Sequence, residues 1–110
     1  MTDAGRRLVE RYLALATDPD PDAYLAQFDD DAVVEDEGRR HEGIGAVRAW
    51  WAAVPEVGYA VRSIEVSGDG HRAVVEVSGD FPGSPVLLEH GFGLGSDGRI
   101  RVLAIRPLTP

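Results

Sequence analysis

The sequence predicts a single α+β domain, in which one curved sheet packs against a layer of helices. Its 110 residues suit one domain rather than two. Apolar residues recur with a helical period in the first half of the chain and alternate with polar residues in the second half. Turn residues separate the alternating segments. Helices followed by an antiparallel meander form an α+β plan, because the sheet has to cover its apolar face with the helices.

Three helices are expected in the first half of the chain. Asp3–Thr17 carries apolar residues at a spacing of about 3.6 residues, with charged residues mostly on the opposite side. Asp20 is a good N-cap and Pro21 a good first-turn residue for a short second helix. The apolar side of that helix is expected to carry Tyr24, Leu25 and Phe28. Ile44–Val54 has the spacing of a third helix, which Pro55 ends.

Strands are expected where short apolar alternations lie between turn residues. The expected strands are residues 32–37, 57–67, 72–81, 86–94 and 99–106. The segments expected to connect or interrupt them are a turn at 29–31, a loop at 38–43, hairpin turns at 68–70 and 96–98, and a break at 82–85. In the third of these strands Ala73, Val75 and Val77 are expected to face inward.

Composition excludes several classes of function. The formal net charge is −8, from 19 acidic and 11 basic residues, and no basic run exceeds two residues. Nucleic acid is therefore not an expected partner, because phosphate contacts require a basic patch. No apolar stretch approaches the ~20 residues that span a membrane. The chain has no cysteine and its N-terminal region has no apolar signal core, so we expect a cytoplasmic protein.

No motif for a metal ion or a cofactor is present. His41, His71 and His90 lack metal-ligand spacing, and the run of aspartates at 29–31 lacks the calcium-loop pattern. The alternating glycines Gly91, Gly93 and Gly95 lie within an expected strand, without the strand-to-helix context of a phosphate-binding loop. We therefore expect neither a metal nor a cofactor.

Asp36 is the first of three polar residues on faces that are otherwise apolar. It is in phase with Ala32 and Val34, whereas Glu35 and Glu37 fall on the opposite face. An apolar cavity makes a carboxylate a stronger base, so this position suits a general base. The alternative is that Asp36 caps the loop that follows.

His90 and Tyr12 are the other two. His90 is in phase with Val86, Leu88, Phe92 and Leu94, where it is either a core histidine with a partner or a catalytic group. Tyr12 lies on the apolar side of the first helix, where its hydroxyl either reaches a partner in the core or points into a cavity. Burial of such groups requires compensation, so all three are candidate site residues.

The segment Asp29–Trp51, DDDAVVEDEGRRHEGIGAVRAWW, resembles a characteristic part of the ketosteroid isomerase-like or SnoaL-like family of the nuclear-transport-factor-2-like superfamily. There a strand of the type A-x-V-E-D precedes a loop, a glycine and a third helix. The preceding ERYLALATDPDPDAYLAQF resembles the first two helices of that family. The resemblance implies a cone-shaped, mixed or antiparallel sheet wrapped around three N-terminal helices. It does not select one reaction, because this superfamily hosts several.

The resemblance also implies roles for single residues. In the isomerases the tyrosine of an R-Y pair on the first helix donates to the developing oxyanion, and Tyr12 follows Arg11 here. The aspartate of their E-D pair is the proton-shuttling base, which corresponds to Asp36. Their second oxyanion donor, a protonated aspartic acid, corresponds to His90, or to Glu89 if the register differs by one. That departure speaks against steroid isomerisation as such.

We therefore expect a small acid–base enzyme of isomerase, cyclase or dehydratase type, with Asp36 as base and Tyr12 and His90 as donors. Its substrate would be a small apolar carbonyl compound such as a polyketide, terpenoid or steroid-like molecule. The expected substrate-binding residues are Val34, Trp50, Trp51, Phe28, Leu88 and Phe92. The alternative is a non-catalytic binding or dimerisation module of the same fold.

A homodimer through the sheet is also expected, because folds of this kind usually dimerise in that way. The alternating glycines at 91, 93 and 95 would lie on the outer face of the sheet. Leu87, Leu103 and Ile105 are expected on exposed positions.

Overall fold

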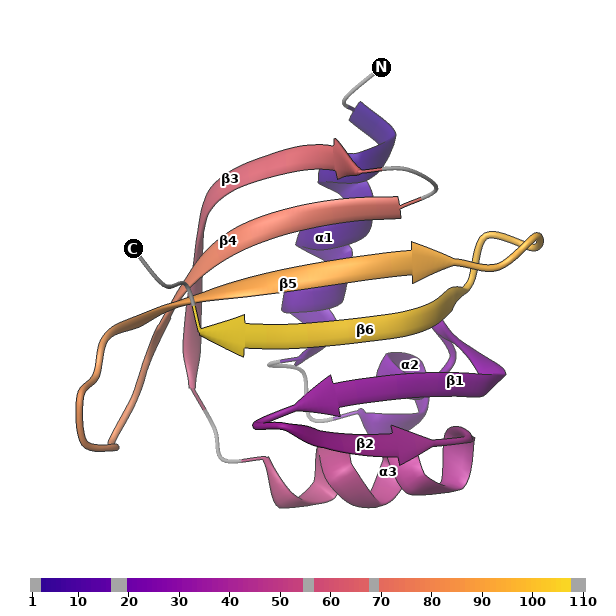
Figure 1. Ribbon diagram of the computed structural model, residues 1–110, viewed down its shortest axis with the longest axis horizontal. Helices are drawn as coiled ribbons and strands as arrows, with labels where there is room; N and C mark the ends of the chain where they lie inside the picture. Colours follow the sequence, from indigo (N-terminus) through magenta and orange to yellow (C-terminus); the bar gives the residue numbers. More distant parts are fainter. Residues whose placement is uncertain (1–2, 17–19, 55–56, 68–69, 108–110) are drawn as a thin grey trace.

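The computed structural model describes residues 3–16, 20–54, 57–67 and 70–107, and it confirms the predicted α+β plan (Figure 1). Its elements, in chain order, are α1 (Asp3–Ala16), α2 (Pro21–Leu25), β1 (Phe28–Asp36), β2 (Arg39–Glu42), α3 (Ile44–Ala53), β3 (Gly58–Ser67), β4 (Gly70–Ser78), β5 (Val86–Leu94) and β6 (Ile100–Pro107). The three helices and the last four strands lie within a few residues of the expected bounds. Of the expected hairpin turn at 68–70, residues 68 and 69 lie outside the described residues.

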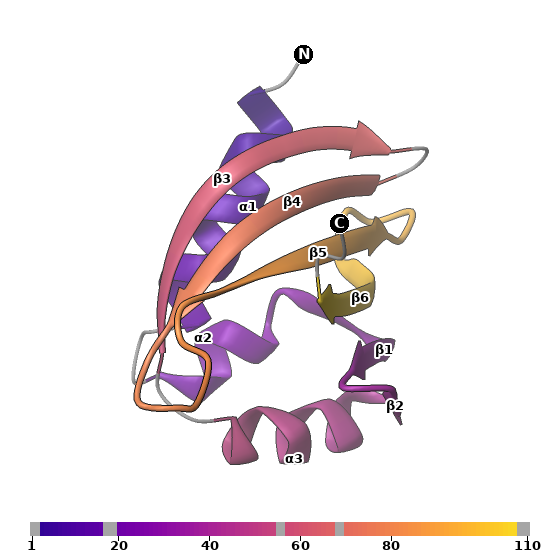
Figure 2. The same ribbon diagram turned by 60° about the vertical axis from the view of Figure 1, so that its left-hand side comes forward.

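The strands form one mixed sheet in the order β2-β1-β6-β5-β4-β3. β1 and β6 are parallel, and all other neighbours are antiparallel. The sheet is curved and does not close, and the helices lie on its concave side (Figure 2). There α1 packs against β3, and α3 packs against β1 and β2. Local sequence explains where α2 begins, because the Asp20 carboxylate accepts hydrogen bonds from the Asp22 and Ala23 amides.

The segment between α2 and α3 differs from the sequence prediction. The expected turn at 29–31 is part of β1, which begins at Phe28, and the expected loop at 38–43 contains β2. Glu37 and Gly38 both have positive φ, 54° and 75°, which lets a two-residue turn fold β2 back onto β1. The Asp29 carboxylate accepts a hydrogen bond from the Asp31 amide beside a register shift in β1, so a local turn-like bond persists within the strand.

The core lies between the helices and the concave face. The predicted inward positions Ala73, Val75 and Val77 on β4 are buried, as are Val9 and Leu13 of α1. Other buried apolar residues include Tyr12, Tyr24, Phe28, Val34, Phe92, Ile100 and Leu103. Burial of this apolar surface is the main term that stabilises the domain.

Two expectations about exposure are wrong. Leu103 was expected to be exposed but is fully buried, and Ile105 is half-buried on the concave face. The reason is register: Leu103 is paired with Phe92 and Ile105 with His90, and directly paired residues share one face of a sheet. Leu87 is exposed, as expected, and Val102 of β6 is exposed as well.

Candidate functional site

One row of paired residues across the sheet carries the polar side chains of the site. Pairing runs from Arg39 on β2 to Asp36 on β1, then to Ile105 on β6, His90 on β5 and Ala73 on β4. All five therefore share the concave face. Asp36 and His90 are separated by one intervening strand, so their Cα atoms are about 10 Å apart. The two candidate catalytic groups thus face the same space with an isoleucine between them.

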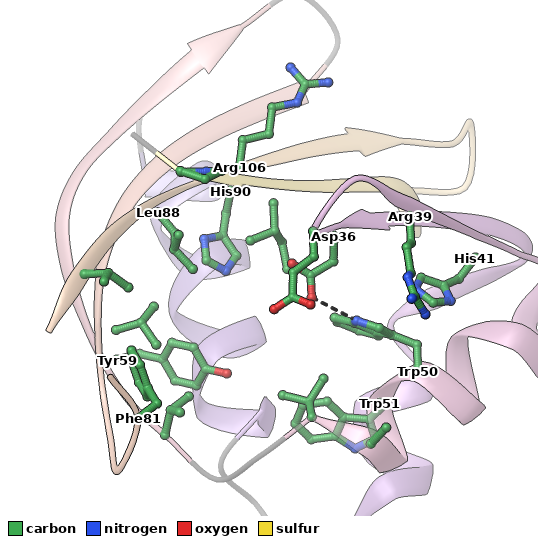
Figure 3. A pocket seen from close by; sticks show the side chains of 18 of the residues that line it. Asp36, Arg39, His41, Trp50, Trp51, Tyr59, Phe81, Leu88, His90 and Arg106 are labelled. Atoms are coloured by element: carbon green, nitrogen blue, oxygen red, sulfur yellow. Dashed lines mark hydrogen bonds between the residues drawn. The ribbon is translucent and has the colours of Figure 1, made fainter. Parts of the chain in front are cut away.

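That space is a cavity of about 730 Å³ between the sheet and α3 (Figure 3). Apart from the charged groups at positions 36, 37, 39 and 106, most of its wall is apolar or aromatic. The residues that line it are Tyr12, Asp36, Glu37, Arg39, His41, Ala49, Trp50, Trp51, Ala53, Val54, Val57, Tyr59, Val77, Phe81, Val86, Leu88, His90, Ile105, Arg106 and Pro107.

Six of the nine predicted site residues line this cavity: Tyr12, Asp36, Trp50, Trp51, Leu88 and His90. Val34, Phe28 and Phe92 do not line it, and each is almost completely buried in the core. Strand alternation places these three on the inner face, but the cavity lies nearer the ends of the strands that carry Asp36 and Tyr59. Phe92 instead packs against the rings of His90 and Tyr12.

Asp36 lies at the end of β1, where it receives one hydrogen bond from α3. The Trp50 indole N–H donates to Asp36 Oδ2 at 3.1 Å (Figure 3). This bond fixes the orientation of the carboxyl group and occupies one of its two oxygens. No other hydrogen bond to the Asp36 side chain occurs within the part of the chain that the structure describes, so Oδ1 is available to a ligand.

His90 is 2% exposed and neutral at neutral pH. Burial lowers the pKa of its imidazole from 6.5 to about 4. Its Nδ1 atom is fully buried without a hydrogen-bond partner. Because Nδ1 is buried, Nε2 is the ring nitrogen through which His90 can donate to a ligand in the cavity that it lines. Glu89 points the other way and lies 3.7 Å from the Arg72 guanidinium, so His90 is the residue of this pair that faces the site.

The lowered pKa of His90 makes the stability of the fold depend on pH. Between about pH 6.5 and 4 the unfolded histidine binds more protons than the folded one, so the free energy of unfolding falls as the pH falls through this window. Across this window His90 lowers the free energy of unfolding by on the order of 3 kcal/mol. Urea unfolding should show that the free energy of unfolding falls less between pH 7 and pH 4.5 in His90→Leu than in the wild type. An equal loss in both proteins would contradict the burial of a neutral His90.

Tyr12 forms a buried pair with Tyr24 of α2. Their hydroxyl oxygens are 2.9 Å apart and either can be the donor. Burial raises the pKa of both hydroxyls well above the ordinary value, so both remain protonated. The Tyr24 ring also stacks on Trp51 with centroids 3.9 Å apart, which links the pair to α3. Sequence analysis placed Tyr24 in the core but did not identify it as the partner of Tyr12.

Tyr59 of β3 is a wall residue that sequence analysis missed. Burial raises the pKa of its hydroxyl, and the charge of Asp36 raises it further, so this hydroxyl lies within electrostatic reach of the carboxylate. Its cross-strand partner is Val77, which was predicted to face inward. Regular pairing counted back from the hairpin turn would place Ala60 opposite Val77. Only the register shift between Val61 and Ser63 brings Tyr59 onto the inner face. Sequence alternation alone therefore gave no signal for Tyr59.

Arg39 and His41 are further wall residues that the sequence prediction placed in a loop. Glu37 also lines the cavity, although it was expected on the outer face at the end of the strand 32–37. Arg39 and His41 are paired with Asp36 and Val34, so both project onto the concave face. Figure 3 shows Arg39, His41 and Trp50 together on one side of the cavity. Arg106, from β6, lies on another side, and its guanidinium is 3.8 Å from Glu35 on the outer face.

Two other properties bear on the expected partners. Among the described residues, no three His, Asp or Glu side chains are gathered closely enough to hold a metal ion. None of the helices that the structure describes has the length and apolar character of a membrane span. The expected cytoplasmic location stays a prediction.

The curved sheet, the helices on its concave side and the cavity between them define a nuclear-transport-factor-2-like fold. The family model of the SnoaL-like domain matches residues 9–102. The chain therefore belongs to the SnoaL-like domain family, as the segment Asp29–Trp51 led us to expect.

Solved structures agree with this assignment. A candidate polyketide cyclase from Sinorhizobium meliloti is 41% identical, with a TM-score of 0.81, over 91% of this chain and 94% of that one. A nuclear-transport-factor-2-like protein of unknown function from Cytophaga hutchinsonii is 13% identical, with a TM-score of 0.77, over 94% and 89%. The epoxide hydrolase/cyclase-like enzyme SalBIII, described for pyran ring formation in the polyether salinomycin, is 18% identical, with a TM-score of 0.75, over 99% and 95%. The last two show the fold alone. No curated protein matched the sequence.

Proposed function

We propose that this chain is an acid–base enzyme that acts on a small, largely apolar carbonyl compound, with Asp36 as the general base. The observation that carries the proposal is the row across the sheet, which directs Asp36 and His90 into one largely apolar cavity. Asp36 is half-buried and His90 is buried, and holding both polar groups in an apolar cavity without an ion pair is costly, so the protein is expected to use them.

In the proposed reaction the carboxylate of Asp36 removes a proton from the carbon next to a carbonyl group. The C–H bond breaks, an O–H bond forms on Asp36, and the electron pair moves to the carbonyl oxygen. His90 and Tyr12 donate hydrogen bonds to that oxygen, and Tyr24 donates to Tyr12 in turn. The enolate then takes the proton back at another carbon, expels a leaving group or attacks a second carbonyl. These outcomes correspond to isomerase, dehydratase and cyclase reactions.

The size and lining of the cavity support a substrate of polyketide, terpenoid or steroid-like character. A volume of about 730 Å³ is within the range of pockets that enclose drug-sized molecules. Trp51, Phe81 and Leu88 supply flat or branched apolar surface around the polar groups. The candidate polyketide cyclase that is 41% identical is consistent with the polyketide class.

Proton exchange separates an enzyme from a binding module. Apolar ketones are incubated in D₂O with catalytic amounts of protein, and NMR follows the loss of the hydrogen next to the carbonyl. We expect exchange well above the buffer rate and proportional to protein concentration. Ligands that bind without any exchange would favour the alternative, a non-catalytic small-molecule-binding module.

We also propose that the chain forms a homodimer through the outer face of the sheet. Leu87 is 42% and Val102 37% exposed on that face. Gly91 and Gly93 lie between them, and the absence of side chains there allows a close approach. Sedimentation equilibrium should give twice the mass of the chain, and Leu87→Asp combined with Val102→Asp should give the monomer. A monomeric wild type at micromolar concentration would reject the dimer.

A further inference from the structure

Adjacent arginines at the start of β2 have opposite surroundings. Arg40 points to the outer face, where its guanidinium is 3.0 Å from Glu42 and 3.7 Å from Glu35. Arg39 points to the concave face and lines the cavity. No carboxylate within the described ranges lies within ion-pair distance of Arg39. Arg40 therefore has carboxylate partners on the outer face, whereas the guanidinium of Arg39 is available to a ligand in the cavity.

The polar groups of the cavity lie at two ends. His90 and Tyr12 are buried at the inner end, while Arg39 and His41 are on β2, at the edge of the sheet. Arg106, the other arginine of the wall, already has Glu35 as a partner. Arg39 is therefore the cation that a ligand in the cavity can reach.

We propose that Arg39 is a specificity-determining residue that binds a carboxylate at the outer end of the substrate. This inference rests on the proposed function, and it narrows the substrate class to an apolar carbonyl compound that carries an acid group. Guanidinium groups match carboxylates because two N–H donors pair with two oxygens. Asp36 and Arg39 are neighbours in the row, with Cα atoms roughly 5 Å apart, so the acid group lies on the β2 side of the carbon that loses its proton.

The charges around this end of the cavity make the cation necessary. The protein as a whole is acidic, with a net charge of −8, and Asp36 and Glu37 both line the cavity. An anionic substrate is repelled by these groups unless a cation adjoins its acid group. Removing Arg39 should therefore weaken binding of the acid through both a lost contact and uncompensated repulsion.

The test compares naphthoylpropionic acid with its methyl ester, because they differ only in the charged group. Isothermal titration should show that wild type binds the acid more tightly than the ester. Arg39→Gln should weaken binding of the acid by about tenfold and change the affinity for the ester less than twofold. Arg101→Gln is the matched control, because it removes the same charge from an exposed residue of β6 that does not line the cavity.

An unchanged affinity for the acid in Arg39→Gln, or an equal loss in Arg101→Gln, would overturn the inference. So would the failure of wild type to bind either compound, or binding of the ester as tightly as the acid. Arg39-dependent binding of the acid without any proton exchange would instead overturn the proposed function and leave the carboxylate site intact.

Discussion

Asp36→Asn is expected to lower the rate of proton exchange by about 10³-fold while ligand affinity changes less than threefold, because the general base is lost and the shape is kept. An asparagine side chain still accepts the hydrogen bond that Trp50 Nε1 donates over 3.1 Å to the aspartate. It cannot hold the proton that the reaction removes from carbon. Binding and chemistry are therefore expected to separate in this variant.

Glu35→Gln is the matched control for this prediction. Glu35 is the neighbouring carboxylate on β1, but it faces the outer side, where it lies 3.7 Å from Arg40 and 3.8 Å from Arg106. The same NMR exchange assay should give a rate close to wild type in Glu35→Gln. A rate within a few-fold of wild type in Asp36→Asn would show that Asp36 is not the base.

His90→Leu is expected to lower the exchange rate by about 100-fold and, at the same time, to leave the fold as stable as wild type or more stable. The rate falls because a donor to the developing oxyanion is lost. The stability is kept because the variant removes Nδ1, a buried atom without a partner that costs about 1–3 kcal/mol. Loss of activity together with retained stability is typical of a functional residue.

His71→Leu provides the comparison for this prediction. His71 is paired with Phe92, so it shares the concave face, and it also has a buried Nδ1 without a partner. It does not line the cavity. Urea unfolding should show similar stability changes in the two variants, whereas only His90→Leu should lose exchange activity. Equal activity losses in both would mean that His90 acts through packing alone.

The period of the strands made the inward direction of Asp36 and His90 predictable. Each residue is in phase with apolar neighbours, and a strand offers only two faces. The same argument placed Glu89 outward. The helices followed from the apolar spacing and from the cap at Asp20, which local sequence determines. These predictions needed no knowledge of which strands are neighbours.

What depends on contacts between distant segments was not predictable. Nothing in the sequence shows which of two adjacent tryptophans reaches Asp36, because the bond joins β1 to α3. Phe28 and Phe92 have the inward direction of wall residues, but their depth in the core depends on how the helices pack. Arg39 was missed for another reason: a non-glycine residue, Glu37, adopts a positive φ in the turn that begins β2.

The central claim is that Asp36 moves a proton within this cavity. The most direct measurement follows the absorbance of a panel of β,γ-unsaturated ketones with wild type and Asp36→Asn in parallel. We predict that wild type conjugates the double bond of at least one ketone and that the variant does so about 10³-fold more slowly. Equal rates in the two proteins would contradict the claim, as would ketones that bind in the cavity of wild type and remain unchanged.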